Sequence, residues 1–367
     1  TWCYLLSLNS MELRSLIMDK IISQNVDSSV TFDHNLEILN PMTVSYKHLN
    51  FDLIHNFSHS AMVNHISFSP NGRYLTVCTN SNDNGSELKI WDIQSGKNVK
   101  VINPEYFISA SFFFNETDFV VITSNIDYRG GLMQYYSLNN NNKIREKEIE
   151  EMFYLEKFNI DPSYKYILHC GTQVTRTHYI VVRDISNGKV VNRLAINNGI
   201  TGIDFESPNT VIIFFKDYNN NNNNTIRWDF INNSKENIGS IGNLNTMYLE
   251  TAIGKKTIVT ANSYLKRSGF FSSEFGEQLS IWTNNGDKIN EIKETPKISN
   301  LSISPNGELI AYGGNMKFGI YNTKGEHIVL DNGNVVDAPP KKVLFSSDGI
   351  HVVATRGDTL QLWKYKE

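Results

Sequence analysis

The sequence contains little cysteine and no excess of basic residues. Only three cysteines occur among the 367 residues, Cys3, Cys78 and Cys170, and no two of them form a CxxC pair. This spacing does not indicate a zinc site or a redox motif, and a sparse, odd number of cysteines is typical of a reducing compartment. Lysine and arginine together number 34 against 38 acidic residues, for a net charge of -4. Nucleic-acid-binding surfaces are usually basic, so this balance argues against nucleic acid as a direct partner.

The chain also lacks long apolar runs. The longest, such as residues 211–215, have the length of a strand and are far too short to cross a bilayer. The first residues, TWCYLL, contain neither the basic region nor the apolar core of a signal peptide. We therefore expect a cytoplasmic or nuclear protein that does not bind membranes.

Motifs for catalysis and cofactor binding are missing as well. GxSxG, HExxH and GxGxxG do not occur, and residues 254–257 hold only part of a phosphate-binding loop. Residues 80–85 begin like a calcium loop, but its twelfth position is Trp91 instead of glutamate. His55, His59 and His65 lie close together in the sequence, but strand alternation and the repeat account for His59 and His65, so we expect no metal site there. We expect no enzyme, cofactor or metal site, although a site assembled from several repeats would leave no linear motif.

Asparagine, by contrast, is abundant, with 46 residues, about one in eight. The longest runs are residues 139–142 and 219–224. This bias is typical of low-complexity composition tolerated in loops, so we assign it no function.

A repeat dominates the sequence from residue 60 onward. In each copy an apolar residue, which we call the anchor, closes a short strand, a polar turn follows, and a second strand begins six positions later. In the clearest copy, HISFSPNGRYL at residues 65–75, Pro-Asn-Gly supplies the positive φ that a tight turn needs. The copies lie about 45 residues apart on average, the period of a four-stranded propeller blade. The anchors are Phe68, Phe113, Ile160, Phe205, Leu249, Ile303 and Phe345.

A tryptophan-containing third strand follows most copies, and here the sequence resembles the WD-repeat family. The positions that carry the resemblance are the dipeptides Trp91-Asp92 and Trp228-Asp229, the single residues Trp282, Trp363 and Asp184, and His59, nine residues before the first anchor. The resemblance covers residues 45–367 and implies an all-β, seven-bladed propeller. In the family, such a histidine, a Ser/Thr, a turn aspartate and the tryptophan form a buried hydrogen-bonded network. No blade of this sequence holds a complete set, so we expect apolar packing between blades to stabilise the ring.

The last copy provides three strands and ends at Glu367. Residues 51–57, FDLIHNF, are strand-like and precede the first copy. We expect them to supply the missing fourth strand, which would join the two ends of the propeller and leave no open sheet edge there.

Residues 1–44 have a different pattern. Asn9 and Glu12 fit a capping box, and apolar residues at 13, 16, 17 and 21 share one helical face. We expect a short helical segment before the propeller. Residues 1–26 resemble the closing helices of a BTB domain, which would make the chain the end of a longer protein. A helix that packs on the propeller is the alternative.

Partner binding is expected on the face where the blade-to-blade loops meet the loops between second and third strands. Six residues before the first three anchors lie Met62, Phe107 and Tyr154, an apolar arc of the kind that partners use as anchor points. The alternative is that these side chains only cap the blade ends. The equivalent positions in the other blades are Gly199, Asn243, Lys297 and Pro339.

Blade five has extra residues, 262–278, which we predict to form a long loop. A long loop with aromatic residues and two cations is indicative of binding or of packing over the channel. The residues concerned are Tyr264, Lys266, Arg267, Phe270, Phe271 and Phe275.

The resemblance implies a non-catalytic scaffold that binds other proteins or peptides, with roles such as assembling complexes or presenting substrates to a ubiquitin ligase. The ligase role depends on the BTB likeness. The alternatives are a propeller hydrolase or lactonase with its site in the central channel, and a translation or RNA-processing factor of propeller type.

Overall fold

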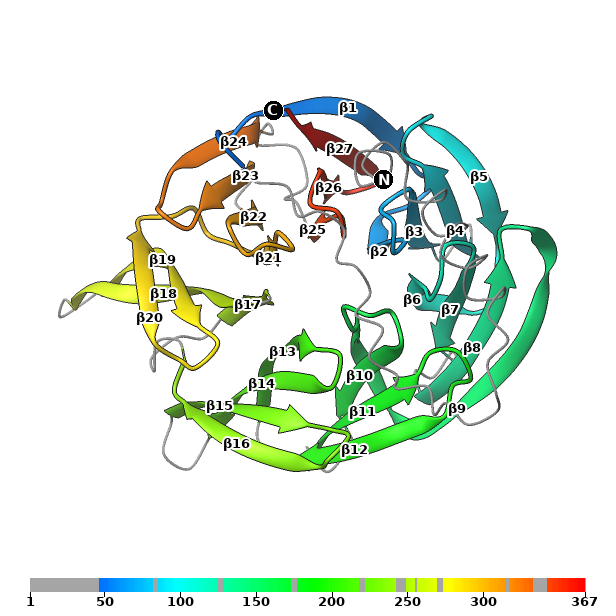
Figure 1. The fold of residues 1–367 in the computed structure, drawn as a ribbon, viewed down its shortest axis with the longest axis horizontal. Helices are drawn as coiled ribbons and strands as arrows, with labels where there is room; N and C mark the ends of the chain where they lie inside the picture. The colour runs from blue at the N-terminus through cyan, green and yellow to red at the C-terminus, as the bar shows by residue number, and fades with distance from the viewer. Residues whose placement is uncertain are drawn as a thin grey trace, which may run out of the picture. The chain divides into compact units, whose positions relative to one another are not determined.

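The described residues form a ring of seven β-sheet blades (Figure 1). The computed structural model describes residues 46–81, 85–124, 129–172, 177–197, 199–217, 222–241, 249–254, 256–268, 273–314, 317–332 and 342–366. All of them belong to the second of the two units into which the chain divides, Pro41–Glu367. No helix is found among these residues, and hence none that could span a membrane. The prediction of an all-β, seven-bladed propeller is confirmed.

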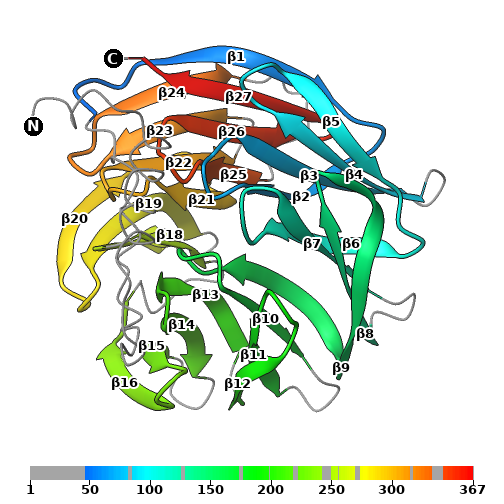
Figure 2. The ribbon, with the colours of Figure 1, turned by 45° about the vertical axis from the view of Figure 1, so that its right-hand side comes forward.

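Each blade has four antiparallel strands, numbered here outward from the axis (Figures 1 and 2). Blade one comprises β2 (Val63–Phe68), β3 (Tyr74–Ser81), β4 (Gly85–Asp92) and β5 (Lys97–Ile102); blade two comprises β6 (Phe107–Phe113), β7 (Asp118–Ser124), β8 (Arg129–Ser137) and the first part of β9 (Asn140–Ile160); blade three comprises the rest of β9, β10 (Tyr166–Thr172), β11 (His178–Asp184) and β12 (Val190–Ile196). Blade four comprises β13 (Gly199–Ser207), β14 (Thr210–Asp217), β15 (Asn222–Asp229) and β16 (Ser234–Gly239); blade five comprises β17 (Leu249–Ile253), β18 (Thr257–Ser268), β19 (Ser273–Thr283) and β20 (Lys288–Lys293). Blade six comprises β21 (Asn300–Ile303), β22 (Leu309–Gly314), β23 (Lys317–Asn322) and β24 (His327–Asn332); blade seven comprises β25 (Lys342–Phe345), β26 (His351–Arg356), β27 (Thr359–Tyr365) and β1 (Phe51–Ser58).

The ring closes through β1. This strand pairs antiparallel with β27 from Phe51↔Tyr365 to Ser58↔Thr359, and so occupies the outermost position of blade seven. The ring of Tyr365 lies edge-on to Tyr46 and to Phe51, with centroid distances of 4.9 and 5.5 Å. The backbone N–H of Lys47 donates a hydrogen bond to the Tyr365 hydroxyl at 3.0 Å. Main-chain pairing and aromatic packing therefore both join the two ends of the propeller.

Blades two and three are not separate sheets. The strand β9 has 21 residues; its first part pairs with β8 and its last part pairs with β10. Tyr154 is paired with Arg129 of β8 and with Thr172 of β10. A single seven-stranded sheet thus takes the place of two blades and of the loop that would connect them.

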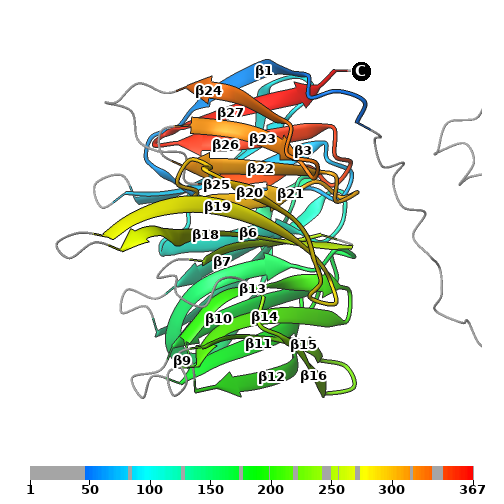
Figure 3. The same ribbon diagram turned by 90° about the vertical axis from the view of Figure 1, so that its left-hand side faces the viewer.

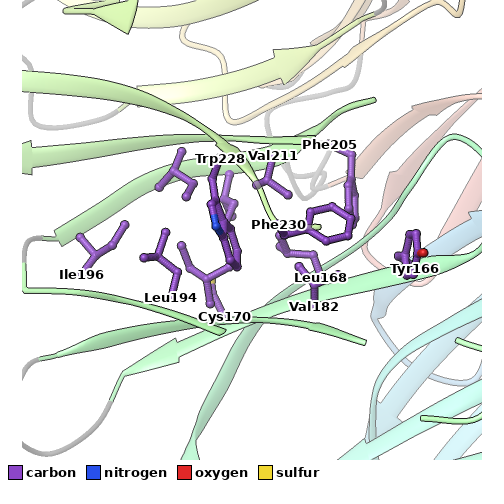
Figure 4. Close-up of a cluster of buried hydrophobic side chains, with 13 residues drawn as sticks. Tyr166, Leu168, Cys170, Val182, Leu194, Ile196, Phe205, Val211, Trp228 and Phe230 are labelled. Carbon is purple, nitrogen blue, oxygen red and sulfur yellow. The ribbon is translucent and has the colours of Figure 1, made fainter. Parts of the chain in front are cut away.

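Apolar packing between blades forms the core. The buried apolar residues divide into seven clusters, one between each pair of neighbouring blades. The largest lies between blades three and four, where Trp228 packs among Cys170, Leu194 and Ile196 (Figure 4). Trp228 is fully buried, and its Nε1 donates to Asn233 Oδ1 at 3.3 Å.

In blades one, six and seven, the turn between the first and second strands uses a serine and an amide or carboxylate at fixed spacing. In blade one, Ser69 Oγ donates to Asn71 Oδ1 at 2.8 Å and accepts from the backbone N–H of Tyr74 at 2.9 Å. Blade six repeats this with Ser304 and Asn306. Gly72 and Gly307 follow in these turns with φ of 70° and 78°, where residues other than glycine are strained.

Blade three has Tyr164 at this glycine position, with φ of 58°. A bulky residue with positive φ persists only where its surroundings hold it in place. Burial raises the pKa of the Tyr164 hydroxyl to about 12, and the charges of Glu116 and Asp348 act in the same direction. Glu116 belongs to the corresponding turn of blade two and Asp348 to that of blade seven. The side chain therefore lies where turns from several blades meet, and its packing offsets the backbone strain.

This strain predicts an unusual order of stability at position 164. Tyr164→Gly and Tyr164→Ala both remove the ring, but only glycine also relieves the left-handed backbone. We expect Tyr164→Gly to be more stable than Tyr164→Ala by about 1 kcal/mol, and both to be less stable than the parent by about 2 kcal/mol or more. Urea unfolding measures all three. Equal stabilities of the two variants would contradict the strain argument.

Candidate functional site

The antiparallel strand order places two kinds of connection at the same end of the blades. These are the blade-to-blade connections and those between second and third strands, and we call this end the loop face; the side view of Figure 3 shows the blades edge-on. Met62 lies directly before β2 and Phe107 is the first residue of β6, so both lie at the loop face. Met62 is 47% exposed, whereas Phe107 is half-buried. Of Tyr154, which lies within β9, the structure describes only the backbone.

The described residues 262–268 and 273–278 lie in strands, where the sequence led us to expect a long loop. The strands β18 and β19 remain paired with each other as far as Ser268↔Ser273. Their outer neighbours are shorter: the pairing of β17 with β18 ends at Asn262, and the pairing of β20 with β19 ends at Gln278. Among the described residues, no strand flanks this hairpin beyond Asn262 and Gln278, and we call its described part beyond them, residues 263–268 and 273–277, the arm. The loop prediction was wrong for these residues, because the extra length of blade five extends the pairing of β18 and β19.

The arm contains four of the residues predicted to bind a partner. Tyr264, Lys266 and Arg267 lie in β18 and Phe275 lies in β19, and the structure describes only their backbone. Phe270 and Phe271 lie outside the described residues, as do Asn243, Pro339 and the predicted helical segment at 1–44 with its BTB likeness. A two-stranded ribbon is marginally stable in water unless it packs against something. The arm is therefore an element that a contact would stabilise.

The positions that resemble WD repeats have two structural roles. Asp92, Asp184 and Asp229 each close the turn after the third strand. Asp92 Oδ1 accepts from the backbone N–H of Ser95, Asp184 Oδ1 from that of Ser186, and Asp229 Oδ1 from that of Asn232. These aspartates therefore build turns and are not directed at a ligand.

The tryptophans and His59 make only fragments of a hydrogen-bonded network. Trp282 Nε1 donates to Thr260 Oγ1 at 3.0 Å. Among the described residues, however, both nitrogens of His59 and the Nε1 atoms of Trp91 and Trp363 have no hydrogen-bond partner. Burial lowers the pKa of His59 to about 4, so this imidazole is neutral at physiological pH. It lies edge-on to Trp91 at 5.8 Å, in an arrangement of packing and not of catalysis.

A group of charged residues near the axis was missed by the sequence reasoning. The anchor of blade five is Ile253, the last residue of β17, and not Leu249, with which that strand begins. With this correction, three positions before each anchor lie His65, Ala110, Lys157, Gly202, Glu250, Asn300 and Lys342, one in each first strand. We call this set the axial layer. The common offset from the turn is a signal that the sequence contained.

Side chains of the axial layer contact the first strand of the next blade. The backbone N–H of Ser111 donates to His65 Nδ1 at 3.4 Å, Lys157 Nζ donates to the carbonyl of Thr201 at 3.5 Å, and Asn300 Oδ1 accepts from the N–H of Val343 at 2.7 Å. Two residues nearer the turn than Gly202, burial raises the pKa of Asp204 of β13 to about 7. These three contacts therefore each join the innermost strand of one blade to that of the next.

Two further observations limit the chemistry of the ring. Within the described part of the chain, no group of three or more His, Cys, Asp and Glu side chains is placed to hold a metal ion. The described cysteines, Cys78 and Cys170, are buried, and burial holds the thiol of Cys78 in its protonated form by raising its pKa to about 12.

Comparison with known proteins agrees with the geometry. A family model described as the WD domain, G-beta repeat, matches residues 51–92, which span β1 to β4. The search of the curated proteins returned no match. With seven four-stranded blades, a match to one repeat and Trp-Asp positions in the third strands, the chain is a WD-repeat β-propeller. Propellers of this class are in general scaffolds that bind other proteins or peptides.

Proposed function

We propose that this propeller is a non-catalytic scaffold that binds a protein partner at its loop face, with the arm of blade five and the rim around Met62 and Phe107 as the contact surface. The arm is the observation that carries the proposal. In the part of the chain that the structure describes, its strands have no neighbour beyond Asn262 and Gln278, and its sequence is rich in aromatic and basic residues. Aromatic and arginine side chains dominate the energetics of protein interfaces.

The exposure of Met62 at the rim of the loop face supports the same contact surface. Met62 is one of the most exposed large apolar residues of the described chain, and Met62 and Phe107 belong to adjacent blades. A flexible thioether adapts to partners of different shape. A partner that spans the loop face would bury this residue and also cover the arm.

The test is the double substitution Phe270→Ala and Phe271→Ala. If these rings are interface anchors, partner binding should weaken by at least about 2 kcal/mol while the melting temperature stays nearly unchanged. Partners are first identified by affinity purification with mass spectrometry, and their dissociation constants are then measured by calorimetry. The matched control is Ile231→Ala with Ile289→Ala, two apolar residues that are 47% and 56% exposed in a turn of blade four and on β20.

The opposite result would indicate that the partner binds at another surface. If the double variant melts at a markedly lower temperature and binds normally once folded, the two phenylalanines stabilise the fold and the arm is not the contact surface. Equal weakening by the control pair would also count against a site confined to the loop face.

A narrower form of the proposal is a substrate adaptor of a ubiquitin ligase in the cytoplasm or nucleus. It depends on the BTB likeness of residues 1–26 and on the sparse cysteines typical of a reducing compartment. The upstream coding sequence tests it, since a complete BTB domain supports the adaptor and a different upstream sequence removes its basis.

A further inference from the structure

The turns of this ring repeatedly use asparagine followed by glycine, a pair with a characteristic reactivity. The glycine nitrogen can attack the side-chain Cγ of the asparagine, because glycine has no side chain to hinder the approach, and asparagine counts among the thermolabile residues. Seven such pairs occur in the sequence. The structure describes both residues of the pairs Asn71-Gly72, Asn187-Gly188, Asn285-Gly286 and Asn306-Gly307, which lie in turns of blades one, three, five and six.

These four pairs share their sequence and their backbone geometry. Each glycine has a positive φ, between 66° and 98°. Each glycine N–H donates a hydrogen bond to a carbonyl within its own turn, at 2.8–3.0 Å. A hydrogen-bonded N–H loses its proton less readily, so this bond slows the attack in all four turns alike. Differences in reactivity must therefore come from the asparagine side chain and from access of water.

Three of the asparagine side chains are held by hydrogen bonds. Asn71 Oδ1 accepts from the Ser69 hydroxyl at 2.8 Å and from the backbone N–H two residues further on at 3.0 Å. Asn306 makes the same two kinds of bond, and Asn187 makes the second kind. The carboxamide group has to leave these bonds before the glycine nitrogen can reach its carbon, so they slow the reaction.

Asn285 has neither form of protection. It is exposed and, within the described part of the chain, its side chain forms no hydrogen bond. Gly286 is half-buried, whereas the glycines of the other three pairs are buried. Water and hydroxide therefore reach this turn more readily than the other three.

We propose that Asn285 is a site of spontaneous deamidation in the folded protein. The Gly286 nitrogen loses its proton and bonds to Asn285 Cγ, and the side-chain nitrogen leaves as ammonia. Water then adds to one of the two carbonyl carbons of the resulting succinimide and breaks that carbon's bond to nitrogen, which gives aspartate or isoaspartate. In isoaspartate the main chain passes through the side-chain methylene and is longer by one carbon. The site belongs to a turn outside the loop face, and its chemistry does not depend on any protein partner.

The longer main chain would disturb a turn that joins blades four and five. Arg227 of β15 donates from Nη2 to the carbonyl of Asn284 at 2.6 Å, and its Nε donates to Glu206 at 2.7 Å. A Cβ added to Gly286 would lie only 2.8 Å from the carbonyl oxygen of Ile238 in β16, so the backbone of the turn lies close against blade four. We therefore expect the isoaspartate form to weaken the contact between blades four and five and to lower the melting temperature.

Peptide mapping by mass spectrometry tests the assignment on protein kept for several weeks at neutral and at mildly alkaline pH, folded or in urea. The quantity compared is the ratio of the rate in urea to the rate in the folded protein at each asparagine, which cancels differences in neighbouring sequence. This ratio should be at least about 10-fold smaller for Asn285 than for Asn71 or Asn306, because each hydrogen bond that must break first raises the barrier. Asn187, with one bond, should fall between them. Equal ratios at Asn285 and Asn71 would overturn the proposal, as would an Asn285 that reacts only in urea.

The variant Asn285→Gln tests the structural consequence. Glutamine keeps the amide but would have to close a larger ring, so it reacts more slowly, and no hydrogen bond is lost in the exchange. Before ageing, the variant should melt at the temperature of the parent. After ageing, the melting temperature of the parent should fall further than that of the variant, since the other Asn-Gly pairs age equally in both. An equal fall in the two proteins would show that conversion in this turn does not weaken the junction between blades four and five.

Discussion

Replacing Trp228 with alanine should lower the free energy of unfolding by about 3–5 kcal/mol, the range for removing a large aromatic side chain from a packed core. Trp228 is fully buried in the interface between blades three and four, where the surrounding side chains come from two sheets (Figure 4). Two sheets cannot close on a cavity of that size without shifting relative to each other. The loss of the Nε1 bond to Asn233 adds to the cost.

Urea unfolding of Trp228→Ala and Trp363→Ala measures this effect with an internal control. Trp363 occupies the same strand position in blade seven but is only half-buried, and its Nε1 has no partner among the described residues. Its removal should therefore cost less. If the two variants are equally destabilised, the inter-blade cluster around Trp228 is not the main source of its contribution.

Tyr365→Ala should destabilise the protein by about 3–4 kcal/mol, and Tyr365→Phe by about 1 kcal/mol or less. The ring of Tyr365 packs edge-on against Tyr46 and Phe51, which precede the first blade, while its hydroxyl accepts one hydrogen bond from Lys47. Alanine removes the aromatic packing that holds β1 on β27, whereas phenylalanine removes only the hydrogen bond. Thermal and urea unfolding distinguish the two substitutions.

The alanine variant should also aggregate faster at elevated temperature. When β1 detaches, β27 becomes an open sheet edge that can pair with another chain. Light scattering during heating records this, with Tyr365→Phe as the matched comparison. A Tyr365→Ala protein that is destabilised but scatters no more than Tyr365→Phe would show that β1 remains bound without the ring.

The number of blades could be predicted because several of the turns between first and second strands need particular residues at particular positions. A serine, an asparagine or aspartate and a glycine at fixed spacing are what the turn of blade one needs for its hydrogen bonds and its positive φ. The same requirement holds in blade six with Ser304 and Asn306. Local requirements of this kind repeat with the fold and are therefore visible in a single sequence.

The sequence analysis missed the axial layer for two reasons. Blade five has no serine–asparagine turn, so its anchor was placed at Leu249, four residues before Ile253, and Glu250 fell out of phase with Lys157 and Lys342. Moreover, the first strands have register shifts between Val63 and His65 and between Ile200 and Gly202, which a strict two-residue alternation does not show. The arm was missed for a related reason, since its pairing extends beyond the four-stranded blade and has no counterpart in the other repeats.

Strand β9 runs without interruption from blade two into blade three, so no loop separates these two blades. A ring of separate sheets can gain, lose or exchange any one blade, because each junction is a loop that tolerates cutting. Between blades two and three the junction is itself hydrogen-bonded on both sides at Tyr154. We therefore expect blades two and three to tolerate transplantation or circular permutation only as a pair.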